Sequence, residues 1–354
     1  MDRKVYLDHL RGFATFAIVV LHVAASGWYA ADVSGVSWQI MNIYDGIMRW
    51  GVPAFMMISG ALFLSREIPV KKIYTKYILR LVAAYVFWNL FYILTLEDTF
   101  QKGPVRSFGE HYIEMITGHY HMWFVVALIM MYICIPIFKK IVSDKRLTGW
   151  CLGILFVLFF LIPSVFRILT DLVLPGGEAG AGPESIFSLR RILRKVTETA
   201  AYSFYYILGF VLDRAELKKK ARVIIYILGA AGLAATILLS LAASLKAGHG
   251  VESFYGNFNV HVLCTAVGVH TWFKYHAFNN ERRNRLAVTL STLGFGVYLV
   301  HPFFIEKLRE ICGLQPLSFS AVVSVPVISV IVFAAALGAS VLLNRIPFVK
   351  KYLV

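Results

Sequence analysis

The chain has 354 residues, of which 58% are apolar or aromatic and only 16% are charged, and its mean hydropathy is +0.69. These values indicate an integral membrane protein, and the long unbroken apolar runs exclude a transmembrane barrel, which would show short alternating strands. The net charge of +15 does not indicate nucleic-acid binding, because the Lys and Arg residues occur in short clusters between apolar runs. We therefore expect membrane lipids, and no nucleic acid, as partners.

Apolar windows of about 20 residues, the length that spans a bilayer as a helix, recur along the chain. They predict an all-α integral membrane protein whose ten transmembrane helices form one bundle. No linker, soluble domain or clear internal repeat interrupts the series, so residues 1–354 are predicted to form a single domain. The sixth window is short, and its start could lie further back, near Ile192. The windows cover residues 10–31, 44–65, 77–96, 120–138, 148–167, 200–212, 222–245, 257–275, 287–306 and 318–344.

The Lys and Arg residues indicate how the bundle is oriented. With both termini on the cytoplasmic side, 24 of the 35 Lys and Arg residues fall in cytoplasmic segments, in agreement with the positive-inside rule. The segment 167–195 is an exception, because it would lie outside and still carries five of these residues. We expect the first helix to be retained rather than cleaved as a signal peptide, because Asp2 and Asp8 lie in the region that would have to be basic.

The first window, DHLRGFATFAIVVLH, carries ionisable residues at both ends. Arg11 and His22 are eleven residues apart, about three helical turns, so they share one face of a helix and lie ~16 Å apart along its axis. With Arg11 at the cytoplasmic boundary, His22 lies near the midplane of a hydrocarbon core about 30 Å thick. Asp8, three residues before Arg11, is predicted to pair with it on the first turn. The alternative is a snorkelling Arg and a core His bonded to a neighbouring helix.

The other polar candidates fall into two levels once each helix is given its direction. Cations at the inner level could hold phosphates by charge-assisted hydrogen bonds, and His22 could serve as a general base, because histidine ordinarily titrates near neutral pH. This layout is typical of a reaction that draws an anionic donor from the cytosol and delivers a neutral group outward. The inner candidates are Ser59 and Arg80, and the outer ones are His119, His121, Trp123, Tyr298 and His301.

Each of these residues also has a purely structural explanation. Ser59 and Gly60 could serve only close helix packing, and Trp123 and Tyr298 could be ordinary packing or interfacial aromatic residues. The His119-x-His121 pair lacks further ligands for zinc, so no metal is predicted. The four cysteines form no C-x-x-C pair and are interpreted as small hydrophobic residues.

Four stretches of the chain together resemble the bacterial membrane-bound acyltransferase-3 family, and within it most closely the surface-polysaccharide O-acetyltransferases of the type that acts on enterobacterial common antigen. The stretches are YLDHLRGFATFAIVVLH, with Arg11 and His22 in an R-x10-H arrangement, VPAFMMISGALFL, HMWFVVALIMMYICIPIF and FGVYLVHPFF. Each is a weak apolar pattern, but the set in this order is fairly specific.

The resemblance implies ten helices with cytoplasmic termini in the bacterial inner membrane, acetyl-CoA as donor and a hydroxyl of a cell-envelope glycan or lipid-linked saccharide as acceptor. It implies His22 as the central catalytic residue, with Arg11 as its partner toward the coenzyme. Many relatives carry an R-x-x-R pair on the third span, but here Tyr77 precedes Arg80 by three residues, so only the second Arg is matched and Lys76 is a possible substitute. The coenzyme ligands expected are therefore Arg11, Arg80, Lys76 and Ser59.

Two other classes of function remain open from the sequence. A multi-span transporter could use Arg11 and His22 to line a path for a small anionic or proton-coupled solute. A binding or sensory module is the second alternative, since the same membrane fold occurs in glycopeptide-resistance racemases, whose soluble domain is not visible here. For the enzyme, direct attack by the acceptor and transfer through an acyl-histidine are both compatible with His22. The acceptor, and an acyl group larger than acetyl, also stay open.

Overall fold

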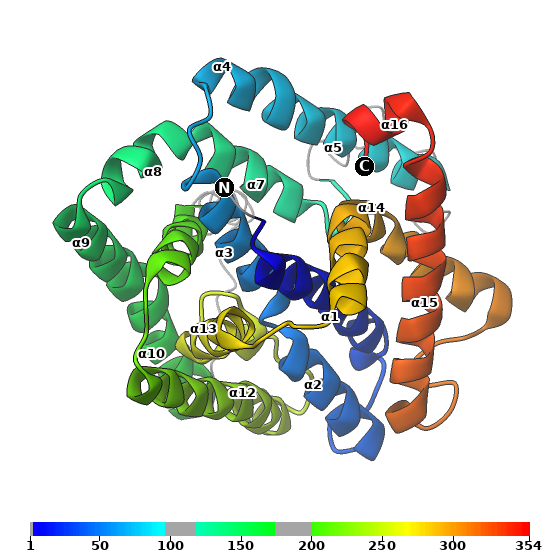
Figure 1. Cartoon of the computed structure of the whole chain (residues 1–354). Coiled ribbons are helices and arrows are strands. Elements are labelled where there is room, and N and C mark those ends of the chain that lie inside the picture. Colours follow the sequence, from blue (N-terminus) through cyan, green and yellow to red (C-terminus); the bar gives the residue numbers. More distant parts are fainter. Residues whose placement is uncertain (1–2, 96–117, 174–199) are drawn as a thin grey trace, which may run out of the picture.

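The computed structural model describes residues 3–95, 118–173 and 200–354, and the regular elements in these ranges are all helices (Figure 1). Seven of the helices described are long and apolar enough to cross a membrane, or eight if the bent pair α7 and α8 is one span. This confirms an all-α integral membrane protein. The eighth predicted window corresponds to α13, which has only 16 residues. The sixth corresponds to a helix at 200–214, and Ile192, where it could begin, lies outside the described residues.

In two places, consecutive helical segments follow one another directly and together form one span. The third span joins α4, η1 and α5, and the fifth joins α9, η3, α10 and η4. The bounds are α1 Val5–Trp28, α2 Val36–Met48, α3 Gly51–Phe63, α4 Val70–Lys72, η1 Ile73–Ile78, α5 Leu79–Thr95, α7 Trp123–Ile133, α8 Ile135–Val142, α9 Lys145–Phe156, η3 Val157–Leu161, α10 Ile162–Ile168, η4 Leu169–Val173, α12 Lys219–Ala247, η5 Ser253–Tyr255, α13 Val260–Tyr275, α14 Glu281–Cys312, α15 Ala321–Leu343 and α16 Pro347–Tyr352.

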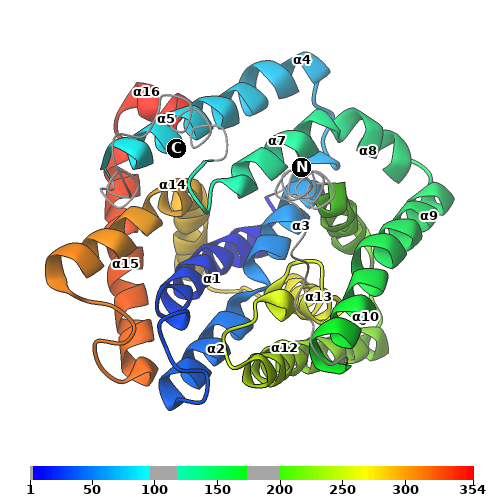
Figure 2. The same cartoon turned by 180° about the vertical axis from the view of Figure 1, so that it is seen from behind.

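Helix α1 lies near the centre of the bundle, with α9 and α15 on opposite sides (Figures 1 and 2). It packs against α2, α3, α13, α14 and α15. In its most apolar window 67% of the residues are buried, compared with 11% in the peripheral span Lys145–Val173. The polar residues of α1 therefore face other helices, whereas the outer helices present apolar side chains to lipid.

The second span begins at Val36, eight residues before the predicted start at 44, and it is interrupted between α2 and α3. The polar residues of α2 lower its hydropathy, although one of them, Asn42, is satisfied inside the bundle. Asn42 is buried, donates to the Ile237 carbonyl oxygen at 3.1 Å and accepts from the Tyr255 hydroxyl. Hydropathy alone placed this boundary wrongly, because it cannot tell a polar residue that faces a neighbouring helix from one that faces water.

Helix α3 and the helix at 200–214 approach each other backbone to backbone. A Cβ atom at Gly60 would lie 1.7 Å from the carbonyl oxygen of Tyr206, and one at Gly209 would lie 2.1 Å from that of Met57. Only glycine fits at such a distance. The structural explanation of Gly60 is therefore confirmed, and the contact fixes the position of the neighbouring Ser59.

Candidate active site

A cavity of about 390 Å³ opens beside the N-terminal end of α1, and we call it the inner cavity. It is lined by four cationic side chains and a single carboxylate. Such a surplus of positive charge favours phosphate groups, because Arg and Lys donate charge-assisted hydrogen bonds to their oxygens. Its walls come from the chain before α1, from the first turns of α1 and from the end of α3 with the residues after it. The lining residues are Arg3, Lys4, Leu7, Asp8, Arg11, Ala61, Leu62, Ser65 and Arg66.

The predicted direct pairing of Asp8 with Arg11 is wrong. Asp8 accepts two hydrogen bonds from Arg3, at 2.7 and 2.9 Å, while Arg11 donates to the Ser291 hydroxyl on α14 at 3.1 Å. The same hydroxyl also interacts with Asp8. Because Asp8 is already occupied by Arg3, the charge of Arg11 remains available to the inner cavity.

Two other predicted coenzyme ligands lie away from the lining of this cavity. Arg80 donates to the carbonyl oxygen of Val354, and its guanidinium lies 5.8 Å from the ring centre of Phe295. Lys76 lies over the ring of Tyr77, at 5.8 Å from its centre.

Ser59 and Arg11 both interact with Tyr132 of α7. The Tyr132 hydroxyl interacts with the Ser59 hydroxyl, and the same phenol interacts electrostatically with both Arg11 and Arg80. The structure thus brings Arg11, Ser59 and Arg80 around one tyrosine, but of the three only Arg11 lines the inner cavity.

His22 lies three turns further along α1, between two more cavities. The smaller, of about 120 Å³, reaches it from the interior of the bundle, and the larger, of about 560 Å³, is called the outer cavity here. His22 lines both, together with Arg49 and Trp123. Trp123 also stacks on Tyr202, with ring centres 5.7 Å apart. A reagent in either cavity can therefore reach the His22 ring.

The hydrogen bonds around His22 determine which of its ring nitrogens is free. Nδ1 of His301 lies 2.8 Å from the Tyr298 carbonyl oxygen and 3.2 Å from that of Val297. Since a carbonyl oxygen only accepts, this nitrogen carries the proton and the Nε2 of neutral His301 must accept. Nε2 of His301 lies 2.8 Å from Nδ1 of His22, which therefore donates. In this assignment Nε2 of His22 has an unprotonated lone pair and is suited to act as a base.

The predicted outer histidines lie beside this pair. His121 is buried with its ring centre 5.7 Å from that of His301, and its Nδ1 lies 2.8 Å from the Nδ1 of His119. Nε2 of His119 lies 3.4 Å from a carboxylate oxygen of Glu306. The Tyr298 hydroxyl donates to the carbonyl oxygen of His121. The structure thus brings His119, His121, Tyr298 and His301 together around His22.

The outer cavity combines aromatic rings with charges of both signs. Tyr29, Tyr120 and Trp123 contribute the rings, and the ring of Tyr120 meets His22 edge to face with centres 5.4 Å apart. Partial burial raises the pKa of the Glu252 carboxyl. Flat apolar faces with a few oriented polar groups are typical of sites for small polar ligands. The charged lining residues are Arg49, Glu252, Glu306 and Arg309.

Arg49 and its partner Asp45 were not among the residues predicted from the sequence. Arg49 is ion-paired with Asp45 at 2.6 Å, and its guanidinium lies 4.3 Å from the ring centre of Tyr255. An acid and a base four residues apart inside an apolar window were the available signal, because ionisable groups at such depth are functional candidates. No comparable signal existed for Ser291, whose small polar side chain is ordinary in a membrane helix.

Comparison with known proteins identifies the family of the chain. A family model described as an acyltransferase domain matches residues 4–345. Searches of curated proteins and of solved structures returned no match to the chain. The family match covers α1 with both Arg11 and His22, and also α3, α7 and α14, and it does not favour the transporter alternative. The chain belongs to the acyltransferase-3 family, and the protein is a multi-pass membrane acyltransferase.

Proposed function

We propose that the protein is an O-acetyltransferase of the bacterial cytoplasmic membrane. In this proposal it moves the acetyl group of cytosolic acetyl-CoA to a hydroxyl of a cell-envelope glycan or lipid-linked saccharide, in the manner of surface-polysaccharide O-acetyltransferases. The observation that carries it is the position of His22. His22 lines two cavities and lies three turns along α1 from a cavity rich in cations.

The inner cavity supports coenzyme A as the donor. Its cations suit the phosphates of a nucleotide, and Arg11 and His22 share a helix face with ~16 Å between them along the axis. The pantetheine arm of the coenzyme would bridge this distance and bring the thioester to His22. We keep Arg80, Lys76 and Ser59 as further candidate ligands behind Arg11. This binding mode needs no metal ion.

The proposed chemistry begins with deprotonation of the acceptor hydroxyl by Nε2 of His22. The alkoxide attacks the thioester carbonyl, the carbon–sulfur bond breaks, and the coenzyme thiolate takes the proton back from His22. Arg49, which lines the same cavities, supplies positive charge for the oxyanion of the tetrahedral intermediate. In the second route His22 first accepts the acetyl group and then passes it to the acceptor. Trp123, Tyr298, His121 and His301 belong to the acceptor side.

The experiment is acetyl transfer by the purified protein in nanodiscs, with acceptor glycan isolated from cells that lack the gene. We expect release of the coenzyme thiol and a glycan heavier by one acetyl group. His22→Ala should lower the rate about 10²–10⁴-fold, which is the usual contribution of a general base, and still bind acetyl-CoA. His249→Ala, which replaces an exposed histidine, is the matched control.

A folded His22→Ala protein that binds acetyl-CoA and acetylates the glycan at the normal rate would contradict the proposal. Rapid quenching followed by peptide mass analysis separates the two routes. An acetyl group on the peptide that contains His22 indicates the acyl-histidine route, and its absence during turnover indicates direct attack.

A further inference from the structure

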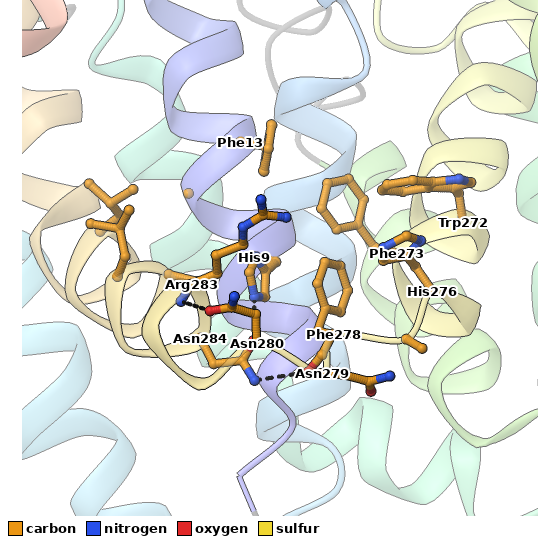
Figure 3. Close-up of a pocket in the computed structure, with 15 residues that line it drawn as sticks. His9, Phe13, Trp272, Phe273, His276, Phe278, Asn279, Asn280, Arg283 and Asn284 are labelled. Atoms are coloured by element: carbon orange, nitrogen blue, oxygen red, sulfur yellow. Dashed lines mark hydrogen bonds between the residues drawn. The ribbon is translucent and has the colours of Figure 1, made fainter.

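A third large cavity lies on a different side of α1, where the helix meets the end of α13 and the start of α14 (Figure 3). Its volume is about 640 Å³, within the range of sites for small ligands. His9, Gly12 and Phe13 contribute to it from α1, whereas Asp8 and Arg11 line the inner cavity. We call it the lateral pocket, and the proposed transfer reaction does not use it.

One end of the lateral pocket is apolar and open to the membrane. Phe13 and Leu286 are each 58% exposed and Trp272 is 46% exposed. Because these positions lie on helices of a membrane bundle, their exposed faces meet lipid chains rather than water. The apolar wall continues inward through Phe273 and Leu290.

The other end is polar and carries an arginine. Asn279 and Asn280 come from the turn between α13 and α14, and Figure 3 shows them at the end of the pocket opposite Phe13. Arg283, in the first turn of α14, points into the space between these ends (Figure 3). Among the described residues no carboxylate is ion-paired with Arg283, whereas its neighbour Arg285 pairs with Glu281 at 3.5 Å.

A ring stack and two hydrogen bonds form the floor of the lateral pocket. The His9 ring stacks on Phe278 with centres 3.9 Å apart, and its Nε2 is 2.9 Å from the side-chain oxygen of Asn284. Asn284 also donates to the Phe278 carbonyl oxygen at 2.9 Å. The polar atoms of the floor are therefore satisfied, and Arg283 is the charge left for a ligand.

We propose that the lateral pocket binds one anionic phospholipid. Arg283 holds the phosphate, the amides of Asn279 and Asn280 face the rest of the headgroup, and the acyl chains lie against Phe13, Trp272 and Leu286. Basic pockets between membrane helices recognise anionic lipid headgroups in this way. A free phosphate ion would leave the apolar wall uncovered, and a zwitterionic lipid would bring its own cationic group beside Arg283. The proposal does not depend on the acetyl-transfer reaction.

Quenching of Trp272 by brominated lipid tests this proposal. The protein is placed in phosphatidylcholine nanodiscs that contain the same small fraction of either brominated phosphatidylglycerol or brominated phosphatidylcholine. The Trp272 contribution is the difference between the wild-type protein and Trp272→Phe. We expect phosphatidylglycerol to occupy the site with about fivefold preference, since the attraction of a net anionic lipid to one Lys or Arg contributes about 1 kcal/mol. Arg283→Gln should remove the preference.

Arg282→Gln is the matched control, because Arg282 is the adjacent exposed arginine and does not line the pocket. It should retain the preference. Equal quenching by the two lipids in the wild-type protein overturns the proposal. So does an equal loss of the phosphatidylglycerol preference in Arg283→Gln and Arg282→Gln. Relief of the quenching by excess inorganic phosphate also overturns it, because the pocket would then be a site for a soluble anion. Native mass spectrometry of retained phosphatidylglycerol provides a second readout that does not depend on Trp272.

Discussion

At the scale of single residues, the orientation of His22 depends on a partner 279 positions later in the chain. The carbonyl oxygens of Val297 and Tyr298 hold the proton of His301 on Nδ1, and His301 in turn holds the proton of His22 on Nδ1. In this arrangement His22 is a base that is oriented by a neighbouring residue, as in catalytic triads. We therefore interpret His301 as a positioning residue for His22.

His301→Phe should lower the acetyl-transfer rate at saturating substrate. The variant removes the acceptor for the Nδ1 proton of His22, and the loss of a buried hydrogen bond, worth ~1–3 kcal/mol, corresponds to about tenfold or more in rate. The KM for acetyl-CoA should not change, because the inner cavity lies three helical turns away. His301→Gln is the control, since its amide oxygen can accept the same bond and should preserve most of the rate. Equal losses in the two variants would argue against a positioning role.

Arg66→Gln should weaken acetyl-CoA binding without changing the rate at saturation. Arg66 lines the inner cavity, and a hydrogen bond to a charged group contributes ~1.5–3 kcal/mol, so KM should rise about tenfold. Lys71→Gln provides the control, because Lys71 is exposed and lies outside the lining of that cavity. Titration calorimetry with acetyl-CoA and steady-state kinetics give the two values. An unchanged KM would mean that the nucleotide binds elsewhere.

At the scale of elements, one crossing of two helices holds the inner part of the site. Gly60 of α3 and Gly209 of the helix at 200–214 allow these two backbones to touch. Ser59, which is adjacent to Gly60 at this crossing, interacts with Tyr132 of α7. A change at the crossing should therefore affect both the stability of the bundle and the surroundings of Arg11.

Gly60→Ala should destabilise the protein. The new Cβ would lie 1.7 Å from a backbone oxygen that cannot move without displacing its helix, so the cost should reach at least the ~1–3 kcal/mol typical of overpacking. Gly149→Ala in α9 is the matched control, since nothing lies within 4 Å of that position and alanine favours a helix by ~0.5–1 kcal/mol. Thermal unfolding in detergent should show a lower midpoint for the first variant only. Equal midpoints would show that the helices can separate at no cost.

At the scale of the whole molecule, the two ends of α1 serve two different cavities. The inner cavity lies on the side of the bundle that carries Arg66 and Lys139, whose side chain donates to the Arg66 carbonyl oxygen at 2.5 Å. The outer cavity lies near the far end of α14, where Glu306 and Arg309 line it. Delivery of an acetyl group across the membrane requires that these two sides face different compartments.

The native Cys312 provides a test of this orientation. It is an exposed, free cysteine at the end of α14, on the side of the outer cavity. A membrane-impermeant maleimide should label it in intact cells. Ser143→Cys, introduced together with Cys312→Ser, should react only after permeabilisation, because Ser143 is exposed on the side of Lys139. The opposite pattern would invert the orientation that the Lys and Arg residues predict.

The parts of the site that depend on residues close together in the sequence could be predicted. The shared face of Arg11 and His22 follows from helix geometry, and their depth follows from the position of charges along an apolar run. The pairing of Asp8 with Arg11 failed, because helical spacing takes no account of Arg3, which lies just outside the helix and reaches the carboxylate first. Arg49 was missed because the predicted window 44–65 put it and Asp45 in the first turns of the second span, where charged residues are ordinary.

The sequence by itself determined the class of the protein and sorted its candidate residues into two levels, because hydropathy and helical periodicity are properties of short windows. Only the tertiary structure decided which residues meet at one level. The contacts of His22 with His301, of Arg11 with Ser291 and of Gly60 with Tyr206 join distant segments of the chain. Such contacts depend on how helices pack side by side, and in lipid that packing is determined by surface shape and a few hydrogen bonds rather than by hydrophobicity.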